Sequence, residues 1–189
     1  LVNKNGSIDW LCLPRFDSGA CFAALLGRPE HGRWLVAPVA PIRRVTRQYR
    51  GDSLVLDTTF ETEEGVVTVT DCMPVRTAEP DLVRLVRGIS GRVKMRMELV
   101  VRFDYGSITP WVQRDEGGLT AVGGPDTLHL RTPVSLVGED WTTVGDFEVA
   151  EGQQVPFVLT WHPSHLPPPP PIEAAAAVET TLEFWRNWT

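Results

Sequence analysis

The feature that most constrains the fold of this chain is a period-two alternation of apolar and polar side chains. It is clearest over residues 93–103, where apolar residues at every odd position, from Val93 to Phe103, alternate with mostly charged residues such as Lys94 and Arg96. Successive side chains of a strand point to opposite faces of a sheet, so this pattern predicts a strand with one buried face. A chain built from such segments must fold as a sheet whose apolar face is covered.

Further strand-like segments follow one another along most of the chain, separated by turn sequences such as residues 63–65 and 123–126. Many short strands with turns between them and few crossover helices predict an all-β fold, an antiparallel sandwich or barrel, and we expect the antiparallel β-sandwich. The predicted strands span residues 8–13, 53–62, 65–72, 82–89, 93–103, 119–122, 127–130, 134–137, 141–149 and 155–161.

Two helices are expected beside the strands. One is a short helix near the N-terminus, over residues 20–26, with Ser18 as its N-cap, because a serine hydroxyl can accept a free amide N–H of the first turn. The other follows five consecutive prolines and spans residues 172–188, where residues 174–177 are alanines. Alanine is the strongest helix former, and the apolar residues of this segment fall on one stripe.

The order of these segments predicts a domain followed by a connection to something else. We expect residues 1–166 to form the β-sandwich domain and residues 167–189 to form a proline-rich linker and helix, because a run of prolines adopts a stiff extended spacer. In the alternative, the helix folds back onto the sandwich, and both contacts can exist at once.

Size and charge exclude several classes of partner. The 189 residues suit one ordinary domain with a substantial core. A net charge of −6 lacks the basic field that neutralises phosphates, so we expect no nucleic acid partner. No apolar run is long enough to span a bilayer, so we expect no membrane partner. The chain starts abruptly at Leu1 without a visible signal peptide, which leaves a missing leader open.

The cysteines and histidines predict neither a disulfide framework nor a metal site. The chain has an odd number of cysteines, Cys12, Cys21 and Cys72, and their spacing is not that of a zinc site. The four histidines are scattered along the sequence. Each cysteine has apolar neighbours, which favours buried thiols in a reducing, cytoplasmic compartment. No glycine-rich phosphate loop is present, so we expect no cofactor.

A polar and aromatic loop follows the first predicted strand. Pro14 ends the strand because it has no N–H to donate, and Arg15, Phe16 and Asp17 come directly after it. Loops that are anchored by a buried strand often carry binding groups, so these three residues are candidate binding residues. In the alternative, Arg15 and Asp17 pair with each other or cap the next helix.

Tryptophan is unusually frequent, with seven residues against two tyrosines. Indole faces stack on the C–H faces of sugars, so this content is suggestive of carbohydrate binding. Trp10, Trp34, Trp141 and Trp161 fall in strand patterns and are expected in the core. Trp111 falls on a loop and is the best candidate for an exposed, sugar-stacking ring, with packing against a neighbouring loop or another domain as the alternative.

The opening motif, residues 6–18, resembles the start of the N-terminal domain of bacterial and archaeal trehalases and glucoamylases of glycoside hydrolase family 15. That motif is long and specific, and shorter matches extend the resemblance over nearly the whole chain. These shorter matches are residues 21–27, 32–34, 71–74, 103–106, 110–111 and 183–188.

The resemblance implies a supersandwich-like β-sandwich that is non-catalytic and packs against a C-terminal (α/α)6 barrel. In that family two glutamates on barrel loops hydrolyse an α-glucoside, as a general acid and its partner carboxylate. This chain lacks that sequence, so no residue here is expected to be catalytic. The domain can lend a loop to the rim of the active site: Arg15 hydrogen-bonds sugar hydroxyls or orders a barrel loop, Phe16 forms a wall and Asp17 orients Arg15. Whether the enzyme is a trehalase or a glucoamylase stays open.

Two other classes of function remain open beside this one. The chain can be a stand-alone carbohydrate-binding module that uses Trp111 and its neighbours. It can also be an interaction domain that forms a homo-oligomer through an exposed apolar patch. Sugar binding by the chain alone supports the first, and dimers in solution support the second.

Overall fold

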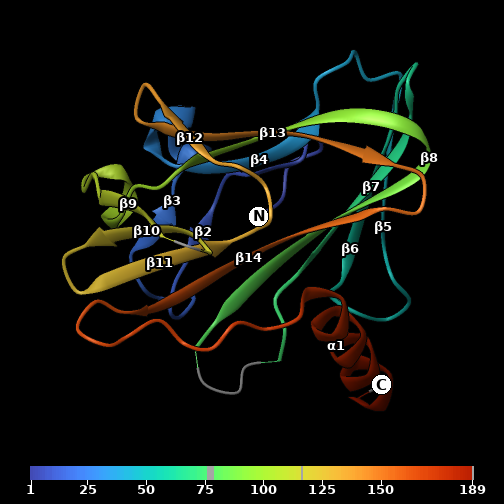
Figure 1. Ribbon diagram of the computed structural model, residues 1–189. Coiled ribbons are helices and arrows are strands. Elements are labelled where there is room, and N and C mark those ends of the chain that lie inside the picture. Colours follow the sequence, from blue (N-terminus) through green and yellow to red (C-terminus); the bar gives the residue numbers. More distant parts are fainter. Residues whose placement is uncertain (76–78, 116, 189) are drawn as a thin grey trace.

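The computed structural model describes residues 1–75, 79–115 and 117–188, and it shows two facing layers of antiparallel strands with a helix on one flank (Figure 1). The predicted all-β sandwich is therefore confirmed. The first layer has the strand order β5 (Arg44–Tyr49), β6 (Leu56–Glu61), β7 (Gly65–Cys72), β8 (Asp81–Val100), β14 (Gln154–Pro163), β11 (Asp126–Arg131), β10 (Gly118–Gly123) and β9 (Trp111–Asp115). The second layer contains β1 (Ser7–Ile8), β4 (Arg33–Pro38), β8 again, β13 (Thr142–Ala150) and β12 (Val137–Glu139).

Strand β8 belongs to both layers and joins them. Its first half pairs with β7 and β14, and its second half pairs with β4 and β13. Near the middle, Gly91 has φ +69°, and a Cβ there would lie 2.2 Å from the carbonyl oxygen of Glu64. Only glycine fits this conformation and this close approach. The sequence predicted two strands, 82–89 and 93–103, and the structure makes them one strand that ends at Val100.

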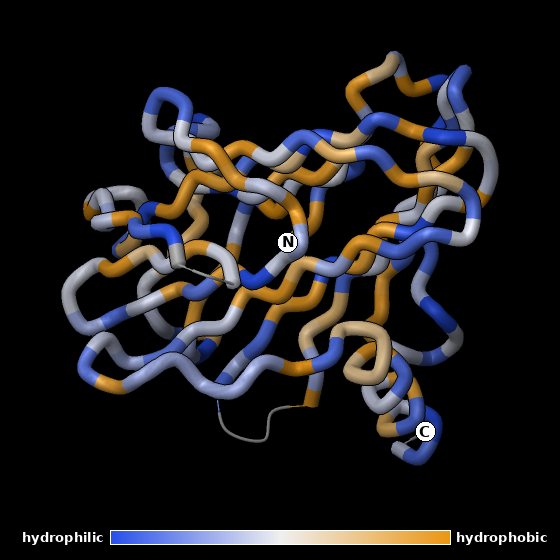
Figure 2. Tube along the Cα trace, viewed as in Figure 1, coloured by the Kyte–Doolittle hydropathy of each residue, from blue (hydrophilic) through white to orange (hydrophobic). Residues whose placement is uncertain are grey.

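The core lies between the two layers. Its largest fully buried side chains include Trp34, Phe60, Met95, Met97 and Phe157. They come from strands of both layers, and each strand places every second residue toward the other layer. Figure 2 shows the result as apolar and polar residues interleaved along the strands, which is the pattern that the sequence analysis used.

The predicted N-terminal helix over residues 20–26 is wrong in its first half. Ala20–Phe22 forms strand β3, which pairs with β2 (Leu11–Cys12), and only Ala24–Leu26 forms a single 3₁₀ turn, η1. The residues of β3 are all buried, so tertiary packing overrides their helical propensity. Ser18 accepts the amide N–H of Arg15 and caps no helix. Two more 3₁₀ turns are η2 (Pro29–His31) and η3 (Asp104–Gly106).

Other predicted elements need smaller corrections. The predicted strand 8–13 is divided between β1 and β2, and the predicted strand 134–137 is replaced by β12, which starts at Val137. Strands β4, β5 and β9 were not predicted. The predicted strands over 65–72, 127–130 and 155–161 are confirmed, the first with its bounds unchanged.

The C-terminal helix folds back onto the sandwich. Helix α1 (Ala174–Trp188) begins after Glu173, whose carboxylate accepts the amide N–H groups of Ala175 and Ala176 at 3.0 and 2.5 Å. One stripe of α1 packs on residues of the first layer; the cluster consists of Ala174, Val178, Leu182, Val55, Cys72, Val83 and Val158. The proline run before the helix also contacts the sandwich, because Arg131 donates a hydrogen bond to the carbonyl oxygen of Pro169 at 2.6 Å.

Candidate functional site

The predicted binding loop, residues 14–17, lies between β2 and β3. The guanidinium of Arg15 donates two hydrogen bonds to Asp17, from Nε at 2.8 Å and from Nη2 at 2.6 Å. These hydrogen bonds lower the pKa of the Asp17 carboxyl. The alternative in which the two charges pair locally is thus confirmed. Phe16 lies between them and is 93% exposed, so the loop presents a free ring flanked by an ion pair.

The C-terminal end of this loop lies beside η3. Gly19 lies next to η3, since a Cβ at Gly19 would be 3.6 Å from the Cα atom of Asp104. On the same side, the rings of Trp10 and Tyr105 contact each other with centroids 5.9 Å apart. The loop and η3 therefore share one end of the sandwich, and Trp111 follows η3 in the chain.

Trp111 is 70% exposed, as predicted, but it is the first residue of β9 and does not lie on a loop. It lines a cleft of about 460 Å³, which we call the Trp cleft. The Trp cleft is formed by the start of β9, the segment after β8 and the β12–β13 hairpin. Its side chains that can bind a ligand are Trp111, Trp141, Arg102, Arg114, Glu139 and Asp140. The predicted loop residues Arg15, Phe16 and Asp17 do not line it.

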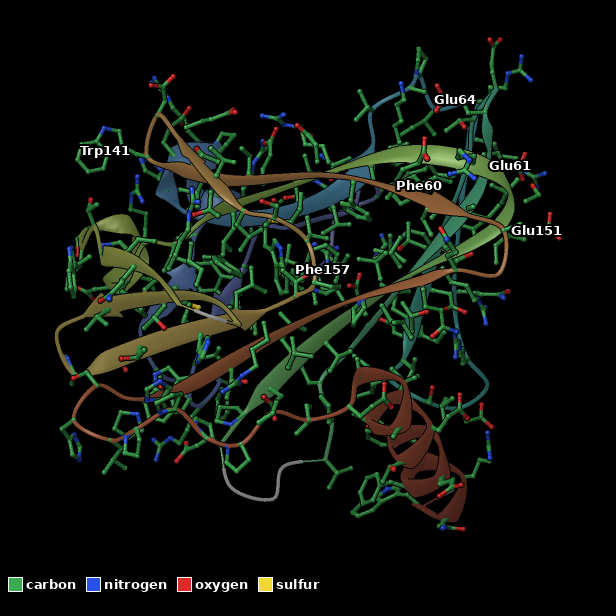
Figure 3. All side chains as sticks on the ribbon, viewed as in Figure 1. Phe60, Glu61, Glu64, Trp141, Glu151 and Phe157 are labelled. Carbon is green, nitrogen blue, oxygen red and sulfur yellow. The ribbon has the colours of Figure 1, made fainter. Side chains whose placement is uncertain are left out.

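Trp141, which the sequence analysis placed in the core, is 82% exposed. It is the second residue of a two-residue turn, because Glu139 pairs with Thr142 across the β12–β13 hairpin. Both turn residues have positive φ, 43° at Asp140 and 64° at Trp141. A non-glycine residue in this conformation costs about 1–2 kcal/mol, and the second position of such a turn is normally glycine. Figure 3 shows the Trp141 ring projecting away from the layers, whereas Phe157 lies between them.

The charged groups of the Trp cleft have different environments. Glu139 accepts a hydrogen bond from Arg96 at 2.9 Å, and Arg96 also binds Asp146 at 3.0 Å, so this carboxylate is held in place. Arg102 forms no ion pair with any described residue. It donates one hydrogen bond, to the carbonyl oxygen of Val101 at 2.7 Å, and burial lowers its pKa. Its other N–H groups are free to bind a ligand.

A second hollow, of about 490 Å³, lies between α1 and the first layer, and we call it the helix groove. Several of its apolar side chains are exposed, including Leu54 at 64%. Its main apolar residues are Leu1, Tyr49, Leu54, Met73 and Trp185. Such an apolar hollow on the surface of one domain is typical of an interface.

The buried carboxylates serve the fold. Asp71 binds the fully buried Arg84 at 2.7 Å, and Asp57 binds Arg50 at 2.8 Å. Burial raises the pKa of Asp81, which accepts a hydrogen bond from the Thr160 hydroxyl.

Within residues 1–75, 79–115 and 117–188, no three His, Cys, Asp or Glu side chains are grouped so as to hold a metal ion. In the same ranges, no helix is both long and apolar enough to cross a membrane.

Sequence reasoning missed Trp141, Arg102, Arg114 and the helix groove. For Trp141 a signal was present, because Gly138 and Asp140 just before it are residue types that favour turns, and a turn exposes its tip. The others gave no local signal, because their exposure depends on which distant strands lie beside them.

The structure thus defines the chain as an antiparallel β-sandwich domain with a helix on its flank. Comparison with known protein families makes this specific. The model of the family "Trehalase-like, N-terminal" matches residues 1–156, and the chain belongs to this family. This match confirms the predicted resemblance to the N-terminal domain of trehalases.

Several relatives named trehalase are similar to this chain, some of them over its whole length. Trehalase of Mycobacterium tuberculosis is 31% identical over 215 residues, which cover 100% of this chain and 31% of that protein. Trehalase of Thermoplasma acidophilum is 24% identical over 194 residues, which cover 100% of this chain and 33% of that protein. Trehalase 1 of Sulfolobus acidocaldarius is 33% identical over 115 residues, 61% of this chain. The chain thus spans about a third of the length of the first two.

Proposed function

We propose that this chain is the non-catalytic N-terminal domain of a trehalase-type glycoside hydrolase and that it supports a C-terminal catalytic (α/α)6 barrel. The observation that carries the proposal is the alignment: relatives named trehalase match all of this chain, yet the chain spans only about a third of their length. The helix that follows the family match at residue 156 then serves as the connection to the barrel.

The helix groove is the surface on which the rest of the polypeptide docks. It lies beside α1, which is the last element before the proposed barrel, and it exposes a strip of apolar side chains. Trp188 at the end of α1 does not line the groove and is 72% exposed. Covering these side chains removes apolar area from water at about 25 cal/mol per Å². In this proposal the β-sandwich domain ends at residue 166 and the linker begins at residue 167. The linker and α1 then lie between the sandwich and the barrel.

The substrate is an α-glucoside, and the barrel supplies both carboxylates that its hydrolysis needs. In this arrangement the 14–17 loop reaches the rim of the active site: Phe16 forms a wall, Asp17 orients Arg15, and Arg15 hydrogen-bonds a sugar hydroxyl or orders a barrel loop. The exposure of the Phe16 ring and the hydrogen bonds from Arg15 to Asp17 support this role. Wild-type kcat and KM in an Arg15→Ala variant of the longer protein would contradict this role of the loop.

The compartment that we propose is the cytoplasm. All three cysteines are free, and burial raises the pKa of both Cys21 and Cys72. Free, buried thiols suit a reducing compartment.

The test compares trehalose and maltose hydrolysis by this chain and by the protein extended through the following coding sequence. We expect hydrolysis by the extended protein and none by the chain alone, because the catalytic carboxylates lie in the extension. Hydrolysis of trehalose alone would identify a trehalase, and hydrolysis of maltose would identify a glucoamylase-like enzyme. Hydrolysis by the chain alone, or an extension without any glycosidase activity, would contradict the proposal.

A further inference from the structure

We propose that the Trp cleft is a carbohydrate-binding site in which Trp111 and Trp141 stack on a short chain of glucosyl units. The choice of glucose as the sugar rests on the proposed function. The assignment of a sugar site does not, because it follows from the two indoles and the polar groups between them.

The strongest observation is that Trp141 is exposed although its backbone conformation is strained and destabilises the fold. Asp140 and Trp141 both adopt positive φ, and the second position of this two-residue turn normally carries glycine. An indole at this position strains the backbone and leaves its apolar surface in water. A strained residue that the fold does not need points to a function, and for an exposed indole that function is ligand contact.

A second indole reaches the same cleft from a distant element. Trp111 comes from the edge strand β9, and Trp141 from the β12–β13 hairpin, yet both line one hollow of about 460 Å³. Small-molecule sites have volumes of roughly 300–1,000 Å³, so this hollow has the size of a small ligand. Two exposed rings on one hollow provide two stacking platforms, and the polarised C–H groups on a pyranose face suit the negative face of an indole.

The charges of the cleft favour a neutral ligand with many hydroxyl groups. The lining carries two arginines, Arg102 and Arg114, and two carboxylates, Glu139 and Asp140, so its formal charge is zero. Arg102 donates one hydrogen bond to the carbonyl oxygen of Val101, and its remaining N–H groups can donate to hydroxyl oxygens of a ligand. The carboxylates can accept from hydroxyl groups. Sugars combine these hydroxyls with apolar ring faces.

The experiment titrates the chain with trehalose, maltose and maltoheptaose, using calorimetry for affinity and NMR of the indole N–H groups for location. We expect binding that is strongest for maltoheptaose, with shifts at two of the seven indole signals. Cellohexaose, whose glucosyl units are β-linked, is the comparison ligand. Equal binding of cellohexaose would overturn the α-glucoside assignment.

Three variants locate the site. Trp111→Ala and Trp141→Gly each remove one ring, and each is expected to weaken binding about tenfold. Glycine at position 141 relieves the backbone strain, so Trp141→Gly keeps the fold intact, as its thermal unfolding will show. Trp188→Ala is the matched control, because it removes an equally exposed indole outside the cleft and leaves affinity unchanged.

Failure of this inference is distinguishable from failure of the proposed function. If the extended protein hydrolyses α-glucosides while the chain binds no sugar, or binds it equally well in the Trp111→Ala and Trp141→Gly variants, the site is refuted and the enzyme assignment stands. If the chain binds sugar through both rings while the extended protein is inactive, the site stands and the enzyme assignment fails.

Discussion

Arg84 connects four segments of the chain inside the sandwich. It is fully buried and donates hydrogen bonds at 2.7 Å to the carboxylate of Asp71 and to the carbonyl oxygens of Trp34 and Gly6. Its guanidinium also lies 5.2 Å from the centroid of the Trp34 ring. The N-terminal segment, β4, β7 and β8 therefore meet at one side chain.

We expect Arg84→Met to destabilise the fold by about 3–5 kcal/mol, because it leaves the buried charge of Asp71 without a partner. Urea unfolding, followed by tryptophan fluorescence, measures this loss. The control is Arg43→Ala, which breaks an exposed ion pair with Glu63 and should cost at most about 1 kcal/mol. An Arg84→Met variant no less stable than Arg43→Ala would show that the buried network does not hold the fold.

Sequence pattern placed Trp141 wrongly and gave no indication that Arg84 is buried, and the reasons differ. Arg84 lies in a predicted strand, where a charged residue indicates the solvent face, but Asp71 on the neighbouring strand compensates its burial. Trp141 has the apolar character of a core residue, but the hairpin places it at a turn. In both cases the outcome depends on the neighbouring strand, which local composition does not reveal.

At the scale of elements, α1 was predicted well because its signals are local. The alanine run after the prolines gave helix bounds within two residues, and the stripe with Val178 and Leu182 is the face that packs. The 20–26 segment failed because the same kind of local propensity was overruled by pairing between β2 and β3. Local signals decide an element only where no partner strand competes.

Cys72 reports on whether α1 is docked. It lies under the helix in the same cluster as Val178, and burial raises the pKa of its thiol to about 11. We expect Val178→Asp to undock α1 and to raise the rate at which Cys72 reacts with DTNB near pH 8. The thiolate fraction at pH 8 rises by roughly two hundredfold when the pKa returns from about 11 toward about 8.5, so the rate should rise by up to about that factor.

The rate is measured in a Cys12→Ser background, because Cys12 is half-buried and would react as well, whereas Cys21 is buried. Glu183→Ala changes an exposed position of the same helix and is the control that should leave the rate unchanged. Equal Cys72 rates in the Val178→Asp variant and in its parent would contradict the docked helix.

At the scale of the whole molecule, β8 makes the two layers one structure, and the helix groove is the apolar surface that this structure leaves open. In the chain alone the groove is in water, so Leu54→Glu should leave thermal stability unchanged, since Leu54 is largely exposed. In the extended protein the same variant should lower the unfolding temperature, because it places a charge in the proposed interface. Differential scanning calorimetry of both forms makes the comparison.

Leu26→Glu is the matched control, because Leu26 is exposed on η1 and does not line the helix groove. An equal response of both forms to Leu54→Glu would show that the groove does not contact the barrel. If sedimentation finds the chain dimeric and Leu54→Glu makes it monomeric, the groove serves self-association instead.

The sequence by itself determined the class of fold, the C-terminal helix and the family. Local patterns in the sequence indicate these properties: a period-two pattern, a run of alanines after prolines, and a long opening motif. Only the tertiary structure decided that β8 crosses between layers, that Arg84 is buried and that Trp111 and Trp141 share one cleft. The physical reason is that side-chain periodicity depends on neighbours along the chain, whereas burial and site geometry depend on residues brought together from distant strands.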